Sequence, residues 1–109
     1  MSHLNMAQIL ELKELMEDSF SDLIQTYIQD SDIKLNALKV AVNSTDSHEA
    51  AELAHSLKGS SANICAESLS ALFQTVENAG RAQDLHHIPQ VIEQIEQEFL
   101  LVKTQLQQL

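Results

Sequence analysis

The sequence predicts an all-α fold, an antiparallel four-helix bundle with an additional short N-terminal helix. Apolar residues recur at spacings of three and four along most of the chain, the period of amphipathic helices, and no alternating strand pattern appears. Only two Gly and one Pro occur, so few helix breakers interrupt these segments. Four long amphipathic segments joined by short loops favour an antiparallel bundle, with the N-terminal helix covering one end. The length of 109 residues indicates a single domain, residues 1–109.

The first two helices are separated by a short polar stretch. The first helix is expected within residues 1–17, with a frayed start. Its apolar positions, spaced by three and four, are Ile9, Leu12, Leu15 and Met16. The second helix is expected over residues 21–42, after a cap at Ser19 or Ser21. Weak helix formers at residues 30–32 allow a bend in its middle.

The third helix follows a polar loop at residues 43–47. Asp46 followed by Glu49 resembles a capping box, which satisfies free backbone N–H groups at a helix start. The helix is expected to end near Asn63. The side expected to pack against the rest of the protein carries Ala50, Leu53, Ala54, Leu57, Ser60, Ser61 and Ile64.

The last two helices complete the predicted bundle. The fourth is expected from Ala66 to about Gly80, because Gly80 with Arg81 is typical of a C-terminal stop. Its buried positions are expected to be Leu69, Leu72, Phe73 and Val76. The fifth is expected from Asp84, with Pro89 near its first turn, where a missing N–H is tolerated. Its apolar stripe consists of Ile88, Val91, Ile92, Ile95, Phe99, Val102 and Leu106.

The composition argues against several classes of function. Sixteen acidic against six basic residues give a formal charge of −10, which repels phosphate backbones, so no nucleic-acid partner is expected. The single Cys65 cannot form an intramolecular disulfide and is expected to be a reduced core residue. No stretch approaches the ~20 apolar residues of a membrane span, and the start lacks the pattern of a signal peptide. A cytoplasmic protein without a membrane partner is expected, with a monomer as the default state.

One face of the third helix is unusual for a solvated surface. His55 points about 155° away from the middle of the packing stripe, so it is expected to face outward. Its helical neighbours are Ala51, Lys58, Gly59 and Ala62, instead of the usual Glu, Lys and Gln. Gly59 costs about 1 kcal/mol relative to Ala in a helix interior. We interpret it as a means of access, because a missing side chain lets another protein surface reach the imidazole.

These residues begin a recognisable motif. From His55 the chain reads H-S-L-K-G-S-S-A-N-I, and the matching positions that follow are Leu69, Leu72, Val76 and Glu77. Together they resemble the histidine-containing phosphotransfer (HPt) domain of bacterial two-component phosphorelays, whose pattern is His-x-Leu-Lys-Gly, small residues and then a hydrophobic helix. The specific part of the resemblance spans residues 55–77. Cys65 departs from it, since the family usually has Gly there.

The resemblance implies a phosphoryl carrier. A receiver-domain aspartate would donate the phosphoryl group to His55, which would pass it to another receiver domain. The implied partners are response-regulator receiver domains and a hybrid sensor kinase. The implied Mg²⁺ belongs to the partner receiver, and no cofactor or metal is expected in this chain. A neutral imidazole suits this chemistry, because its lone pair at pH 7 can attack a phosphoryl group.

Two further side chains are expected to assist His55. The ammonium of Lys58 can attract a phosphoryl group and offset its charge, and it matches the family's Lys. A turn centred on residue 64 or 65 would bring residues 74–77 level with His55, including Gln74 and Glu77. Glu77 matches a position where the family often has Gln or Glu, so a supporting role is predicted. A solvated helix acid is the alternative for Glu77, as a solvated helix Lys is for Lys58.

Other functions lack the residues that they need. No P-loop, Gly-rich phosphate loop or Mg²⁺-binding acidic cluster occurs, so neither ATP binding nor autokinase activity is expected, and the protein is predicted not to be an enzyme. The adjacent His86 and His87 would point ~100° apart on a helix and make a poor metal pair.

The expected partner-binding surface combines two groups of residues. The first is the small-residue face around His55. The second consists of apolar residues from the N-terminal segments, namely Leu12, Met16 and Phe20, each of which has plain core packing as its alternative. The main competing function is a helical adaptor or degenerate HPt module, which binds a receiver or kinase without phosphotransfer. The intact His55, Lys58 and Gly59 favour the relay, since a degenerate copy need not keep them.

Overall fold

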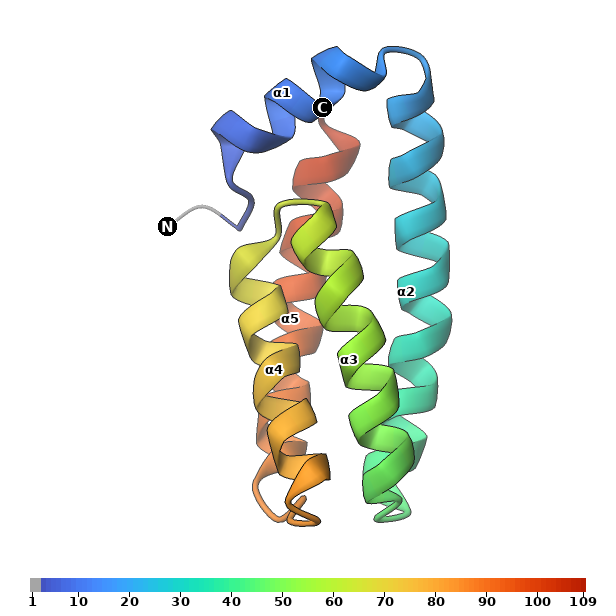
Figure 1. The fold of residues 1–109 in the computed structure, drawn as a ribbon, viewed down its shortest axis with the longest axis vertical. Helices are drawn as coiled ribbons and strands as arrows, with labels where there is room; N and C mark the ends of the chain where they lie inside the picture. Colours follow the sequence, from blue (N-terminus) through green and yellow to red (C-terminus); the bar gives the residue numbers. More distant parts are fainter. Residues whose placement is uncertain (1–2) are drawn as a thin grey trace.

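The computed structural model describes residues 3–109, which form five α-helices (Figure 1). In chain order these are α1 (Met6–Met16), α2 (Ser19–Asn43), α3 (Ser47–Asn63), α4 (Glu67–Arg81) and α5 (Ile88–Gln107). Helices α2 to α5 stand side by side along the long axis with alternating direction, and α1 crosses one end of the bundle above the C-terminus (Figure 1). The predicted antiparallel four-helix bundle with an additional short N-terminal helix is confirmed.

Each long helix buries one apolar face in a common core. Buried side chains from the four helices include Leu38, Leu57, Phe73 and Ile95. The core also contains one paired polar contact, in which the hydroxyls of Tyr27 on α2 and Ser61 on α3 lie 2.9 Å apart. Burial raises the pKa of the Tyr27 hydroxyl. This hydrogen bond ties the middle of α2 to α3, because a buried hydroxyl without a partner would be costly.

Three of the connections between the helices have the same backbone conformation. Among the described residues, positive φ angles occur at four residues other than glycine, namely Glu17, Thr45, Cys65 and Gln83. At the end of α3, the Cys65 N–H donates to the Ala62 carbonyl at 3.0 Å and the Ala66 N–H donates to the Ser61 carbonyl at 2.9 Å. This is a Schellman motif, whose left-handed residue is most often glycine. Thr45 and Gln83 end α2 and α4 in the same way.

This backbone explains why the family usually has Gly at the position of Cys65. The residue needs a φ of 67°, which glycine adopts without strain and other residues do not. The predicted burial of Cys65 is confirmed, and that burial raises the pKa of its thiol.

Gly80 has a different role from the predicted helix stop. Helix α4 continues through Arg81, and the left-handed residue is Gln83. A Cβ atom at Gly80 would lie 2.8 Å from both the Cβ of Ala51 and the carbonyl oxygen of Ser47. Gly80 therefore lets α4 approach the beginning of α3 closely.

The beginning of the chain is packed from His3 onward, contrary to the predicted fraying; Met1 and Ser2 lie outside the described residues. The His3 Nδ1 lies 2.9 Å from a carboxylate oxygen of Glu98 on α5, and Leu4 is buried. The Asn5 side chain caps α1 by accepting from the Gln8 N–H. These contacts anchor the start of α1 across the end of the bundle.

Several predicted boundaries shift by a few residues. Helix α2 begins at Ser19 after Asp18, instead of after a serine cap, and it is continuous through residues 30–32. The Asp46 side chain does accept from the Glu49 N–H, so the predicted cap of α3 is confirmed. Helix α5 begins at Ile88, because residues 85–88 form a separate turn in which the Ile88 N–H donates to the Leu85 carbonyl.

Candidate functional site

His55 lies in the middle of α3 and faces away from the core. Its side chain is 60% exposed, so the prediction of an outward ring is confirmed. The ring Nδ1 lies 3.1 Å from Oε2 of Glu77 on α4. Because an ionised carboxylate only accepts hydrogen bonds, this contact assigns the proton to Nδ1. The lone pair is then on Nε2, the nitrogen that the Glu77 contact leaves free.

Lys58, one turn after His55, belongs to the same cluster. Its Nζ donates to Glu77 Oε1 at 2.7 Å and to Gln74 Oε1 at 3.0 Å. Together with the contact between His55 and Glu77, these bonds confirm the predicted register of the α3–α4 hairpin. Lys58 is only partly exposed, so its interpretation as a freely solvated side chain is wrong.

Glu77 is held by donors from two helices. Its side chain is only 11% exposed, which rules out the alternative of a solvated helix acid. The hydrogen bond from Lys58 keeps its pKa below the ordinary value of 4.5, against the opposing effect of burial, and His55 adds to the lowering. An ionised Glu77 can therefore hold the proton of His55 Nδ1 at neutral pH.

Two residues next to this cluster were missed by the sequence analysis. Arg81 donates from one guanidinium nitrogen to Glu52 Oε1 at 2.9 Å and from the other to Glu77 Oε2 at 3.4 Å. The register of the α3–α4 hairpin indicates that these two residues lie near His55 and Glu77. Arg81 lies one turn after Glu77 on α4, and Glu52 lies nearly one turn before His55 on α3. The hydrogen bond between them raises the pKa of Arg81 and lowers the pKa of Glu52.

The open face beside His55 is smaller than predicted. No heavy atom beyond the helix's own backbone and adjacent residues lies within 4 Å of a Cβ built on Gly59, and Ala62 is exposed. The prediction that Ala51 contributes to this face is wrong, since Ala51 is only 1% exposed. It packs against Gly80, because α4 lies closer to this side of α3 than the helix period alone indicates. The accessible small residues are therefore Gly59 and Ala62.

The N-terminal residues predicted to extend the partner surface are less accessible than expected. Phe20 is only 5% exposed, so its prediction as an exposed contact is wrong. Leu12 and Met16 are partly buried against the core. The exposed large apolar side chains of α1 are instead Met6, Leu10 and Leu15, of which Leu15 is 82% exposed although it belongs to the apolar positions predicted for this helix. Helix α1 covers the bundle with a narrower face than its apolar pattern predicts.

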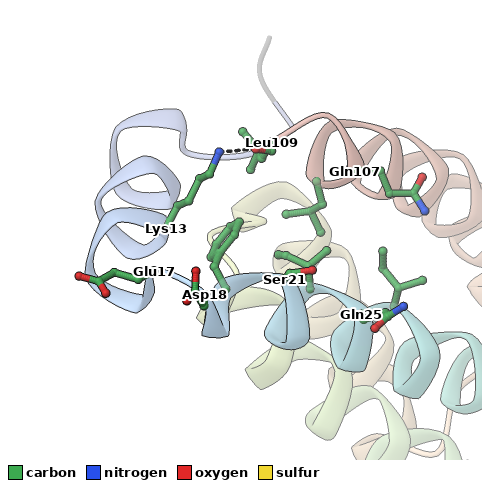
Figure 2. A pocket seen from close by; sticks show the side chains of 11 residues that line it. Lys13, Glu17, Asp18, Ser21, Gln25, Gln107 and Leu109 are labelled. Atoms are coloured by element: carbon green, nitrogen blue, oxygen red, sulfur yellow. Dashed lines mark hydrogen bonds between the residues drawn. The ribbon is translucent and has the colours of Figure 1, made fainter.

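Phe20 instead lines a hollow of about 560 Å³ at the end of the bundle near α1 (Figure 2). Lys13 and Leu109 approach each other across its rim, where the Lys13 ammonium donates to the Leu109 carbonyl (Figure 2). None of the residues of the His55 cluster lines this hollow. The cluster is therefore a surface site on the α3–α4 pair, separate from the hollow.

Residues 3–109 contain neither a helix that could span a membrane nor a cluster suited to a metal ion. None of the five helices combines the length and the apolar character needed to cross a membrane. No group of three or more His, Cys, Asp or Glu side chains is placed to hold a metal ion in this part of the chain. The rings of His86 and His87 meet edge to face, with centroids 4.6 Å apart.

Comparisons with known proteins agree with the fold and the motif. Residues 22–109 match the model of the Hpt domain. The crystal structure of histidine-containing phosphotransfer protein B from Pseudomonas aeruginosa PAO1 matches with a TM-score of 0.93 and 34% identity, covering 97% of this chain and 92% of that one. Histidine-containing phosphotransfer protein 1 of Arabidopsis thaliana is 28% identical over 109 residues, which cover 94% of this chain and 71% of that protein. With the motif that begins at His55 placed on the same bundle, the chain belongs to the Hpt domain family.

Proposed function

We propose that this protein is a histidine phosphotransfer intermediate of a two-component phosphorelay. The observation that carries the proposal is the outward imidazole of His55, whose Nδ1 is bonded to Glu77 and whose neighbour Gly59 leaves open space. An exposed histidine without a function would not require a hydrogen bond to a mostly buried carboxylate on a second helix. The names of both relatives describe histidine-containing phosphotransfer proteins, which supports the same function.

The chemical step transfers a phosphoryl group between two protein side chains. The Nε2 lone pair of His55 attacks the phosphorus of an aspartyl phosphate on a receiver domain. A P–N bond forms while the P–O bond to the aspartate breaks, and the aspartate leaves as a carboxylate. The ring keeps its Nδ1 proton, and the Glu77 carboxylate stabilises the positive charge that the ring gains. Attack on phospho-His55 by a second receiver's aspartate reverses these changes.

Lys58 supplies positive charge near the transferred group. In the unphosphorylated protein its ammonium is bonded to Glu77 and Gln74. A phosphoryl group on His55 would bring a strong acceptor close to this ammonium, which can turn from Gln74 towards it. The partner receiver is proposed to supply Mg²⁺, so the protein acts as a carrier and the chemistry is completed only in the complex. A hybrid sensor kinase is the proposed source of phosphate.

The direct test is phosphotransfer from a labelled receiver. Receivers of the source organism, phosphorylated on aspartate, are mixed with the protein, and label on it should be acid-labile and base-stable, as a phosphoramidate is. His55→Gln is expected to abolish uptake with unchanged helicity and melting, because the ring is mostly exposed. Label on the variant would contradict the site. Binding without any label on the wild-type protein would instead support a helical adaptor.

The docking surface is tested separately. We propose that receivers approach over Gly59 and Ala62, next to His55 and Lys58. Gly59→Leu places a branched side chain in open space and should weaken receiver binding at least tenfold, measured by titration calorimetry, while the fold is retained. A matched change elsewhere, Ala37→Leu on the exposed side of α2, should leave the affinity unchanged. Equal affinities for wild type and Gly59→Leu would contradict the access argument.

A further inference from the structure

Two donors share one oxygen of the Glu77 carboxylate. His55 Nδ1 lies 3.1 Å from Oε2, and a guanidinium nitrogen of Arg81 lies 3.4 Å from the same atom. The other oxygen, Oε1, accepts from Lys58 at 2.7 Å. The oxygen that Arg81 faces is Oε2, so a stronger bond from Arg81 to Glu77 would form at the oxygen that His55 uses.

The competition would ordinarily favour the guanidinium. Arg81 follows Glu77 by four residues on α4, a spacing at which oppositely charged side chains meet on one helix face. Arginine is always charged and its planar fork of N–H donors fits a carboxylate, whereas the imidazole offers a single N–H to Glu77. A full ion pair with Arg81 would turn the carboxylate along α4 and away from α3. The imidazole would then lose the group that fixes its tautomer.

Glu52 provides the guanidinium with a second acceptor. Its Oε1 lies 2.9 Å from Arg81, closer than the 3.4 Å contact between Arg81 and Glu77. Glu52 lies on α3, so this bond draws Arg81 across the hairpin and towards the helix that carries His55. The same bond lowers the pKa of Glu52, which keeps its carboxylate ionised at neutral pH.

We propose that Glu52 is a positioning residue of the phosphotransfer site, which holds Arg81 so that Oε2 of Glu77 stays available to His55 Nδ1. Glu52 acts through Arg81 and Glu77 and has no hydrogen bond to the imidazole. Its effect is to keep the Nδ1-protonated tautomer, in which Nε2 is the nucleophile. The expected effect of Glu52 on phosphoryl transfer rests on the proposed function. Its effect on the tautomer does not, because His55 has a tautomer with or without a partner.

The test is a double-mutant cycle read by NMR. The tautomer of His55 is measured from its ring ¹⁵N shifts above pH 7 in wild type, Glu52→Ala, Arg81→Ala and the double variant. Glu52→Ala should lower the fraction of the Nδ1-protonated tautomer and slow phosphoryl uptake about twofold to fivefold, the range for one surface ion pair. Arg81→Ala alone should keep the wild-type tautomer, because Lys58 still holds Glu77. The double variant should resemble Arg81→Ala, which restores the tautomer.

A simple effect of surface charge predicts a different pattern. Removing the Glu52 charge would then act equally whether Arg81 is present or absent, and equal effects on the tautomer in both backgrounds would overturn the proposal. A loss of the Nδ1-protonated tautomer in Arg81→Ala alone would also overturn it, because Arg81 would then support Glu77 instead of competing for it. Glu96→Ala, which removes an exposed carboxylate paired with Lys39 on α2, is the matched control and should change nothing.

These readouts separate the inference from the proposed function. The NMR measurement needs no receiver and no phosphate, so the role of Glu52 can fail while His55 still carries phosphoryl groups. Conversely, a wild-type protein that never takes up label would defeat the relay, although its tautomers could still follow the predicted cycle.

Discussion

At the scale of single residues, the state of the imidazole depends on the Glu77 carboxylate. A mostly buried carboxylate is costly unless donors surround it, and Glu77 has donors in His55, Lys58 and Arg81. The shortest of the three bonds is the one to Lys58. Lys58 therefore has two effects, one on the incoming phosphoryl group and one on the group that orients the ring.

Lys58→Ala is expected to slow phosphoryl uptake about tenfold without unfolding the domain. The variant loses the positive charge beside His55 and also frees Oε1 of Glu77, which Arg81 can then capture. Single-turnover uptake from a phosphorylated receiver measures the effect, and circular dichroism checks the fold. Lys39→Ala, which removes an exposed cation on α2, should transfer at the wild-type rate. If both variants transfer equally fast, Lys58 has no part in the reaction.

The sequence predicted the residues of the site unevenly. His55, Lys58 and Gly59 could be recognised because their types and spacing form a local motif on one helix. Glu77 could be placed only through the hairpin register. Arg81 and Glu52 were missed because the hairpin register shows that they lie on neighbouring turns, whereas their contact depends on how far the two side chains reach between the helices.

At the scale of helices, the only two glycines have opposite roles within one hairpin. Gly59 on α3 faces open space, whereas Gly80 on α4 faces the backbone and side chains of α3. Gly59→Ala should therefore raise the free energy of unfolding by up to about 1 kcal/mol, the helix preference for Ala. Gly80→Ala should lower it by about 1 to 3 kcal/mol, because the added carbon would lie 2.8 Å from Ala51 and Ser47. Urea unfolding of both variants measures the difference, and changes of the same sign would contradict it.

The left-handed residues at the ends of helices give a second prediction at this scale. Gln83 is exposed and has a φ of 56°, which strains any side chain with a Cβ. Gln83→Gly should stabilise the protein by about 0.5 to 1 kcal/mol, the relief of strain less the entropy that glycine adds to the unfolded chain. Ala82, the preceding residue, has a φ of −81°, so Ala82→Gly should destabilise. Thermal melts of the pair test the prediction, and a lower melting temperature for Gln83→Gly would refute it.

Helix existence was easier to predict than helix ends. All five helices follow from apolar periodicity, and the cap at Asp46 was correctly placed because a local side-chain bond defines it. The end of α4 was placed within one residue, but the role of Gly80 was wrong, because Gly80 was interpreted by its backbone freedom and the structure instead requires its small size. The sequence contains both possibilities, and only the approach of α3 distinguishes them.

At the scale of the whole molecule, the arrangement of α2 to α5 and the position of α1 at one end of the bundle were predictable, whereas the face that α1 packs against the bundle was not. Because the loops are short, consecutive long helices pack antiparallel, and this packing also brings His55 level with Glu77. Helix α1 is held instead by contacts with distant parts of the chain, such as those of His3 with Glu98 and of Lys13 with Leu109. Such contacts leave no periodic pattern, which is why the apolar spacing that includes Leu15 does not show which face of α1 packs.

The net charge of the molecule bears on its stability in acid. Sixteen acidic residues repel one another at neutral pH, so protonation relieves repulsion as the pH falls. Protonation of Glu77 has the opposite effect and destabilises the folded protein. Its pKa in the folded state lies below 4.5, so between that pKa and 4.5 the unfolded chain binds more protons than the folded one. The contribution of Glu77 to the free energy of unfolding is fully present above pH 4.5 and is lost as the pH falls through the pKa of Glu77 in the folded state.

A comparison of variants isolates this contribution from the charge of the whole molecule. Glu77→Gln should be less stable than wild type at pH 6, by up to about 1 kcal/mol, and the gap should narrow towards pH 3. Urea midpoints at several pH values measure the gap, since the repulsion among the other acids is nearly common to both proteins. The cation that contributes most to the lowered pKa is Lys58, so in a Lys58→Ala background the pH dependence of the gap should shrink. A gap that is constant with pH, or that widens in acid, would show that Glu77 is not stabilised as an anion in the folded protein.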